Sequence, residues 1–218
     1  MEALKRADVR AFVGATGSGK GVGINQHLND LKPERLLVFD PLKEYAARGQ
    51  VVTTVSQAIA AMKRQNFKII WQPFDSTDFE GKHFKAQFAL FCAAAFEAGD
   101  LCLLVEELEL VTKPTWAPAA WRMCTKRGRH QRLTIMAATQ RPADADKAFW
   151  SSCTYIRVHA LRETGDKDRM ARVLDLPYDQ ISGLVTTAIS DDKTSITYAE
   201  KDFNAGTSGI KTVVLQRK

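Results

Sequence analysis

Residues 14–20, with the sequence GATGSGK, have the types and spacing of a phosphate-binding loop. The segment matches G-x-x-x-x-G-K, follows an apolar strand expected at Arg10 to Val13, and opens a helix expected from about Gly19 to Leu31. Glycines let the backbone turn tightly, so that successive N–H groups converge on phosphate oxygens, and the N-terminus of the helix adds a partial positive charge. Lys20 would reach the β- and γ-phosphates of a nucleotide. The predicted nucleotide-binding residues are Gly14, Ala15, Thr16, Gly17, Ser18, Gly19, Lys20, Gly21 and Val22.

The residue after the lysine is Gly21, whereas most loops of this kind have Ser or Thr, whose hydroxyl binds Mg²⁺. Val22 cannot supply that hydroxyl, so the metal would take an extra water or a ligand from Thr16 or Ser18. Phosphate binding itself does not need the hydroxyl. The sequence therefore predicts ATP and Mg²⁺ as cofactors, with a somewhat weak Mg²⁺ requirement.

Two adjacent carboxylates, Glu106 and Glu107, follow an apolar strand expected at Leu101 to Val105. In an open α/β sheet, ligands bind at the carboxyl ends of the strands, so these side chains are expected to face the phosphate-binding loop. Glu106 would hold Mg²⁺, directly or through water, and Glu107 would orient or deprotonate the attacking water. Glu109 is expected to point elsewhere. The alternative is that the two glutamates merely begin a helix after the strand.

A second apolar run, Leu133 to Ala138, also ends in polar residues, among them Gln140. If this strand lies between the phosphate-loop strand and the acidic strand, Gln140 would lie near the γ-phosphate and bind it or the attacking water. The alternative is an ordinary transition from strand to loop, with Pro142 ending the pairing.

Between Arg122 and Arg132 there are five Lys or Arg, one His and no acidic residue. One expected role is an arginine finger that reaches the nucleotide of a neighbouring subunit, with Arg129 the first candidate and Arg127 the second. A second role is contact with DNA phosphates. A third interpretation is an ordinary solvated helix end.

Short apolar runs alternate with amphipathic stretches, which predicts βαβ units. We expect an α/β fold, the three-layer sandwich of P-loop NTPases, with a mainly parallel sheet. Because several strand-like segments lie between Lys20 and Glu106, an extra strand is expected between the phosphate-loop strand and the acidic strand. Further strands are expected at Leu36 to Phe39, Val51 to Thr54 and Lys68 to Trp71, with helices at Gln57 to Arg64, capped by Ser56, and at His83 to Ala98, ended by Gly99.

The last forty or so residues are rich in short β-like segments, at Thr186 to Ser190, Ser195 to Tyr198 and Thr212 to Gln216. They are joined by Asp191–Asp192 and by Gly206 to Gly209, and they predict a C-terminal antiparallel β extension on the main sheet. We expect one ATPase domain over residues 1–218, with a core at about 10–183 and the extension at about 184–218.

The composition excludes several classes of protein. Of 218 residues, 45% are hydrophobic and 26% charged, which fits a soluble globular chain and excludes a disordered tail or a fibrous repeat. The longest apolar stretch, Phe88 to Phe96, is far below the ~20 residues of a membrane-spanning helix, so no membrane insertion is expected. Four scattered cysteines indicate buried reduced thiols rather than a disulfide framework or a zinc site.

The ordered set GATGSGKG, LLVFDPLKEY, CLLVEE and RGRHQRLTIMAATQRP resembles the FtsK–HerA superfamily of P-loop translocases. It is most similar to the compact genome-packaging ATPases of tailless double-stranded DNA phages with an internal membrane, over about Arg10 to Ser152. The resemblance implies catalytic roles for Lys20, Glu106, Glu107, Gln140 and an arginine near Arg129. Asp40 matches an aspartate that is common after the second strand, without an assigned role.

The resemblance also implies a homo-oligomeric ring, usually of six subunits, that moves double-stranded DNA through a basic channel. A viral portal or packaging-vertex protein would be a further partner, and the location would be the host cytoplasm or the packaging vertex of the virion. The leading hypothesis is therefore an ATP-driven DNA packaging motor. Two alternatives stay open: a nucleotide-binding assembly scaffold without turnover, which Gly21 favours, and a nucleoside or nucleotide kinase, against which the expected extra strand argues.

Overall fold

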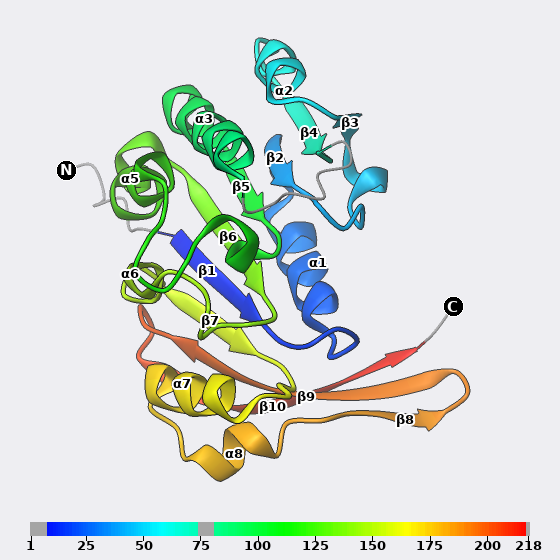
Figure 1. Cartoon of the computed structure of the whole chain (residues 1–218). Coiled ribbons are helices and arrows are strands. Elements are labelled where there is room, and N and C mark those ends of the chain that lie inside the picture. Colours follow the sequence, from blue (N-terminus) through cyan, green and yellow to red (C-terminus); the bar gives the residue numbers. More distant parts are fainter. Residues whose placement is uncertain (1–7, 74–80, 217–218) are drawn as a thin grey trace, which may run out of the picture.

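The computed structural model describes residues 8–73 and 81–216, and ten strands of this part form one sheet (Figure 1). The strand order is β10-β9-β7-β1-β6-β5-β2-β4-β3, and β8 pairs with β9 beside this path. The strands are β1 Asp8–Val13, β2 Arg35–Phe39, β3 Gln50–Val52, β4 Phe67–Trp71, β5 Cys102–Val105, β6 Thr134–Thr139, β7 Tyr155–Val158, β8 Thr186–Ser190, β9 Lys193–Asp202 and β10 Thr207–Gln216. The seven strands from β3 to β7 along this order are parallel, which confirms the predicted fold class.

Helices cover both faces of the sheet, as the three-layer prediction requires (Figure 1). One face packs against α1, and the other packs against α2, α3, α5, α7 and α8. The α-helices are α1 Lys20–Leu31, α2 Val55–Ala61, α3 Lys82–Ala98, α4 Leu108–Val111, α5 Ala119–Arg127, α6 Lys147–Trp150, α7 Thr164–Leu174 and α8 Tyr178–Ser182, and two 3₁₀ turns are η1 Ala46–Arg48 and η2 Gly128–Gln131. All four cysteines are free and buried, as predicted.

The predicted extra strand is present, since β6 lies between β1 and β5. In β1, Val9, Ala11 and Val13 face one core and Phe12 the other, the alternation expected of a strand buried on both faces. Val13 pairs with Thr139, and Val105 pairs with Ala137. The phosphate-binding loop, the acidic pair and Gln140 therefore leave three neighbouring strands at the same edge of the sheet.

One helix start differs from the prediction. Thr54, not Ser56, caps α2, and its side chain accepts a hydrogen bond from the backbone N–H of Gln57. The Gln57 side chain in turn accepts from the backbone N–H of Thr54, which completes a capping box. This reciprocal pair needs a Gln or Glu three residues after the cap, and Ser56 has none. The predicted end of α3 at Gly99 is confirmed, with φ at 55°.

The C-terminal extension is confirmed as antiparallel and continues the main sheet. β9 pairs with β7 through residues 199–202 and with β8 through residues 193–196. β10 pairs with β9 along the whole length of both strands. We call residues 186–216 the C-terminal ribbon. The connection between β9 and β10 lies at residues 203–206 rather than at Gly206 to Gly209, because Asp202 accepts the N–H groups of Asn204 and Ala205 and closes the turn there, so that β10 begins at Thr207.

Among the described residues, no helix combines the length and the apolar character that crossing a membrane requires.

Candidate functional site

The phosphate-binding loop has the left-handed backbone turns that its glycines permit. Gly17 and Gly19 have φ values of 78° and 92°, a region that side chains with a Cβ rarely adopt. The loop is tied to the strand ends beside it, because Gly14 N–H donates to the carbonyl of Thr139 at 3.1 Å and Ala15 N–H to that of Ala160 at 2.9 Å. The backbone is thus held in a cradle at the N-terminus of α1.

The structure brings Lys20 and the acidic pair together. The Lys20 Nζ atom lies 3.2 Å from Glu107 Oε1 and 3.6 Å from Glu106 Oε2. Burial lowers the pKa of Lys20, but the attraction of both carboxylates outweighs burial and raises the pKa above its ordinary value. Burial raises the pKa of Glu106, although Lys20 and the Tyr45 hydroxyl each oppose that rise. The ammonium group therefore stays charged and occupies the space between the loop and the two carboxylates.

Gln140 joins this cluster from the end of β6. Its Nε2 donates to Glu107 Oε1 at 2.7 Å, and its Oε1 accepts from the Thr16 hydroxyl at 2.7 Å. Glu107 itself has a left-handed backbone, with φ at 48°, which turns the chain sharply after β5. Four of the predicted residues, Lys20, Glu106, Glu107 and Gln140, thus lie within one hydrogen-bonded group.

Tyr45 belongs to the site although the sequence analysis did not select it. Its hydroxyl donates to Glu106 Oε1, and its ring is buried beneath α1. Asp40 holds the segment that carries Tyr45, because it accepts hydrogen bonds from the backbone N–H groups of Glu44 at 2.9 Å and Tyr45 at 3.0 Å and from Gln72 Nε2 at 2.8 Å. Asp40 therefore acts on the site through Tyr45. In the sequence, the feature that pointed to this position was an aspartate directly after a buried strand.

Glu109 also lies at the site, and the prediction that it points elsewhere is wrong. Its Oε1 accepts the backbone N–H groups of Gln140 at 2.9 Å and Arg141 at 3.2 Å, because α4 begins directly after Glu107 and turns Glu109 back toward β6. Burial and the charge of Glu107 raise the pKa of Glu109 to about 7. Glu109 therefore fixes the backbone from which Gln140 projects.

The C-terminal ribbon forms one wall of the nucleotide pocket, a role that the sequence analysis missed. The pocket has a volume of about 400 Å³ and is lined by the loop, Glu107, Gln140 and four ribbon residues, Thr186, Thr194, Ile196 and Leu215. The Thr186 hydroxyl donates to the Ser18 carbonyl at 2.9 Å. Ile196 lies so close to Gly19 that a Cβ built there would be 2.6 Å from its Cδ1 atom.

The oxygen ligands that Mg²⁺ prefers are partly in place. Glu106 Oε2 accepts no hydrogen bond from any described residue and lies 3.6 Å from the Lys20 ammonium group, so a metal ion could bind it only where Lys20 now lies or beside it. Thr16 lines the pocket, whereas the Ser18 hydroxyl is buried behind the loop, so of these two residues Thr16 is the one that could replace the missing hydroxyl at Gly21. Within residues 8–73 and 81–216, no cluster of three or more His, Cys, Asp or Glu could hold a metal. The site thus fits an ion held mainly by the nucleotide and water, with Glu106 as its carboxylate ligand.

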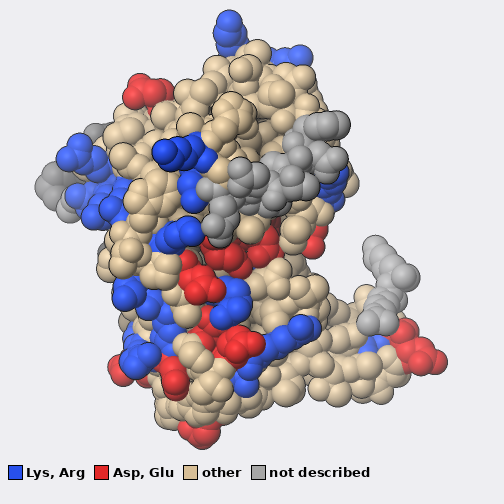
Figure 2. Space-filling view, viewed as in Figure 1, with Lys and Arg blue, Asp and Glu red and all other residues tan. Residues whose placement is uncertain are grey.

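Arg127 and Arg129 lie at the opposite edge of the sheet from Lys20. They precede β6, whose first residue, Thr134, pairs with Asp8 at the beginning of β1. A strand of six residues spans roughly 20 Å, so neither arginine can reach the phosphate-binding loop of its own chain. Both side chains are exposed. Figure 2 shows Lys and Arg gathered over α5 and acidic side chains in a hollow at the carboxyl end of β5.

Comparisons of sequence and of fold show which known proteins this chain is similar to. No protein-family model matches the chain. It is 29% identical to Protein P9 of Pseudoalteromonas phage PM2 over 172 residues, which are 79% of this chain and 77% of that protein. The genome packaging NTPase B204 from Sulfolobus turreted icosahedral virus 2, solved in complex with ATP-gammaS, superposes with a TM-score of 0.68 at 18% identity, over 94% of this chain and 96% of that one.

The fold extends to a more distant protein. VirB4 of Thermoanaerobacter pseudethanolicus superposes with a TM-score of 0.64 at 11% identity, over 100% of this chain and 91% of that one. The predicted resemblance to viral genome-packaging NTPases and the P-loop NTPase fold are therefore confirmed.

Proposed function

We propose that this chain, which shares the fold of viral genome-packaging NTPases, is an ATP-hydrolysing double-stranded DNA translocase and a subunit of a viral packaging motor. The observation that carries the proposal is the group formed by Lys20, Glu107 and Gln140 at the edge where β1, β6 and β5 end. A carboxylate and an amide that face a phosphate-binding lysine suit the attack of water on a γ-phosphate.

The side chains divide the work of hydrolysis. Lys20 exchanges its carboxylate partners for the β- and γ-phosphates when ATP binds, which leaves Glu107 to orient the attacking water and accept its proton. Gln140 holds Glu107 and the water, with Thr16 fixing its amide. Glu106 would hold Mg²⁺, directly or through water, and a bound ion would supply positive charge beside the phosphates.

Arg129, or Arg127 as second candidate, supplies the charge that stabilises the transition state in a neighbouring subunit, because its own site is out of reach. This arrangement needs a homo-oligomer, and we propose a ring of six. Residues 1–218 form one ATPase domain whose core, at about 10–183, continues into the extension at about 184–218. The basic face over α5 contacts DNA phosphates, a portal or packaging-vertex protein is a further partner, and the motor works in the host cytoplasm or at the vertex of the virion.

The test is ATP hydrolysis measured with and without double-stranded DNA. Glu107→Gln should lower kcat about 10²-fold or more while nucleotide still binds, and Lys20→Ala should weaken nucleotide binding itself. Glu97→Gln, the same change at an exposed position on α3, is the matched control and should behave as the wild type. Arg129→Ala should abolish turnover but not nucleotide binding.

Two results would overturn the proposal. One is DNA that neither binds nor stimulates hydrolysis together with full turnover in the Lys20 and Glu107 variants. The other is saturable nucleotide binding without any phosphate release, which would favour an assembly scaffold. Mass measurement with an ATP analogue and duplex DNA reports the number of subunits in the same sample.

A further inference from the structure

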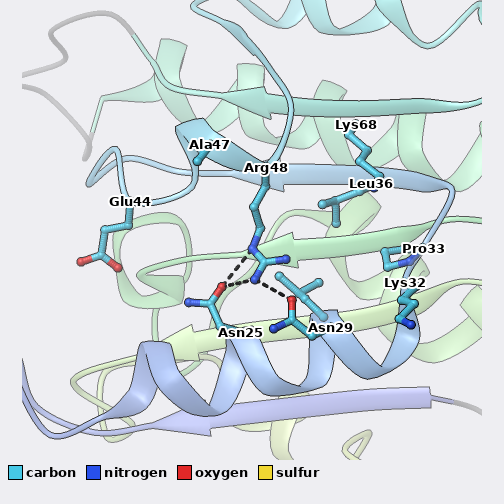
Figure 3. A pocket seen from close by; sticks show the side chains of 10 residues that line it. Asn25, Asn29, Lys32, Pro33, Leu36, Glu44, Ala47, Arg48 and Lys68 are labelled. Carbon is cyan, nitrogen blue, oxygen red and sulfur yellow. Dashed lines mark hydrogen bonds between the residues drawn. The ribbon is translucent and has the colours of Figure 1, made fainter. Parts of the chain in front are cut away.

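A second cavity, of about 680 Å³, lies between α1 and η1 (Figure 3). Its walls come from α1, from η1 and from the strands β2 and β4. Leu28 and Leu36 form part of an apolar floor, whereas Arg48 projects from η1 across the opening toward α1. We call it the Arg48 pocket.

Arg48 is held in place by two amide oxygens. Its Nε donates to Asn25 Oδ1 at 2.9 Å, and its Nη2 donates to Asn25 Oδ1 and, at 3.1 Å, to Asn29 Oδ1. Asn25 and Asn29 are four residues apart, so both lie on the face of α1 toward the pocket. No carboxylate of the described residues forms an ion pair with Arg48, so its positive charge is oriented but not neutralised.

The groups left over in the Arg48 pocket are mostly hydrogen-bond donors. Because Arg48 uses the amide oxygens of Asn25 and Asn29, their NH₂ groups remain, and the third guanidinium nitrogen points toward the side where Lys32 and Lys68 lie (Figure 3). Both lysines are exposed at the rim. Glu44 also lines the pocket, but its carboxylate turns away from Arg48 (Figure 3).

A fixed guanidinium, two amides and two ammonium groups match a ligand that carries several acceptor oxygens and negative charge. We propose that the Arg48 pocket binds a phosphate group. Its volume of about 680 Å³ exceeds that of one phosphate ion and leaves room above the apolar floor for an attached sugar. The phosphate comes from the backbone of duplex DNA or from a free phosphate compound. The DNA source rests on the proposed packaging function, whereas the phosphate chemistry does not.

The Arg48 pocket shares one chain segment with the hydrolytic site. The backbone N–H of Arg48 donates to the carbonyl of Tyr45 at 2.9 Å, and Tyr45 holds Glu106. A phosphate bound to Arg48 would therefore act on the turn that holds Tyr45 against Glu106.

The experiment uses the full chain with its phosphate-binding loop saturated by a non-hydrolysable ATP analogue. Binding of a short fluorescein-labelled duplex is measured by anisotropy between about 50 and 200 mM salt for the wild type, Arg48→Gln and Asn29→Asp. Asn29→Asp keeps the shape of the side chain but gives Arg48 an ionic partner and places a negative charge in the pocket. Arg64→Gln, the same change at an exposed arginine outside the Arg48 pocket, is the control.

If DNA supplies the phosphate, Arg48→Gln makes the negative slope of log K against log salt shallower by about one and weakens DNA binding about eightfold at 0.1 M salt. Asn29→Asp weakens binding at least as much, and Arg64→Gln has a smaller effect than either. Thermal unfolding in the same buffers shows whether each variant is folded.

A second arm uses inorganic phosphate at constant ionic strength and follows the unfolding temperature of the analogue-saturated chain. In one outcome, inorganic phosphate raises the unfolding temperature of the wild type but not of Arg48→Gln, and DNA binding is unchanged by the substitution or absent. This outcome supports the Arg48 pocket with a free phosphate compound as its ligand. If wild-type DNA binding is absent in that case, the packaging proposal fails and the Arg48 pocket stands. The proposal for the Arg48 pocket is overturned if Arg48→Gln and Arg64→Gln behave alike toward both duplex DNA and inorganic phosphate.

Discussion

Tyr45→Phe, which removes one hydroxyl, should weaken Mg²⁺ binding and lower the stability of the protein while leaving the other residues of the site in place. Phe keeps the buried ring but leaves Glu106 Oε1 without the hydrogen bond that Tyr45 donates. A hydrogen bond to a charged group contributes about 1.5–3 kcal/mol, so the free energy of unfolding of the nucleotide-free protein should fall by about 2 kcal/mol. The pKa of Glu106 should rise further, because the Tyr45 hydroxyl is one of the groups that lower it.

The functional effect should appear in the Mg²⁺ dependence of ATP hydrolysis. A partner that orients a metal ligand typically contributes 10- to 100-fold to metal affinity, so the Mg²⁺ concentration at half-maximal rate should rise about tenfold or more. The assay is ATP hydrolysis titrated with Mg²⁺ at saturating nucleotide, together with urea unfolding of the same preparations.

A matched control lies outside the site. Tyr155 donates to Glu200 Oε2 at 2.6 Å, so Tyr155→Phe removes the same kind of bond between β7 and β9. It should lower stability but leave the Mg²⁺ dependence as in the wild type. The reasoning is refuted if the two variants have the same Mg²⁺ dependence, because Tyr45 would then act on stability alone.

Three further predictions concern the pH response, the metal and the nucleoside. The pKa of Glu109 is raised to about 7 in the folded protein. Between the ordinary glutamate pKa and about pH 7, Glu109 is therefore protonated in the folded protein but ionised in the unfolded chain. The free energy of unfolding consequently falls as pH rises over that range. Glu109→Gln should remove this fall and gain about 3 kcal/mol at high pH relative to low pH, measured by urea unfolding; an unchanged pH dependence contradicts it. A Cβ at Gly21 meets no atom within 4 Å, so Gly21→Ser should fold and lower the Mg²⁺ requirement severalfold in the hydrolysis assay; an unchanged requirement would show that the hydroxyl has no access to the metal. Leu215→Ala should raise KM for ATP and for GTP by similar factors of about 3 to 10, if the base packs against the apolar side chains of Leu215 and Ile196 on the ribbon side of the pocket; selective loss of one nucleotide would contradict this.

The parts of the site that the sequence predicts are those encoded locally. The phosphate-binding loop is contiguous, and Glu106, Glu107 and Gln140 directly follow apolar runs, so each can be placed at a strand end from its immediate neighbours. Parallel strands bring their carboxyl ends to one edge, which converts these separate signals into one site. The extra strand between β1 and β5 was expected for a different reason, the several strand-like segments between Lys20 and Glu106, and the structure identifies it as β6.

The remaining parts depend on contacts between distant residues. Tyr45 and Glu106 are 61 residues apart, and Thr186 and Ser18 are 168 apart, so no spacing in the sequence indicates either pair. Glu109 returns to the site because a left-handed residue at Glu107 reverses the chain, and a glutamate gives little warning of that backbone. The position of Arg129 also follows from the sequence, since a residue that precedes a parallel strand lies at the edge of the sheet opposite to the ligand-binding edge.

The contact between Ile196 and Gly19 links two segments that are far apart in the gene. Because Ile196 fills the space where any other residue at position 19 would place its Cβ atom, the two positions cannot change size independently. A chimaera that received its last strands from a protein of the same fold would therefore need the matching loop as well. Attempts to change which nucleotide this chain accepts should randomise both segments in a single library.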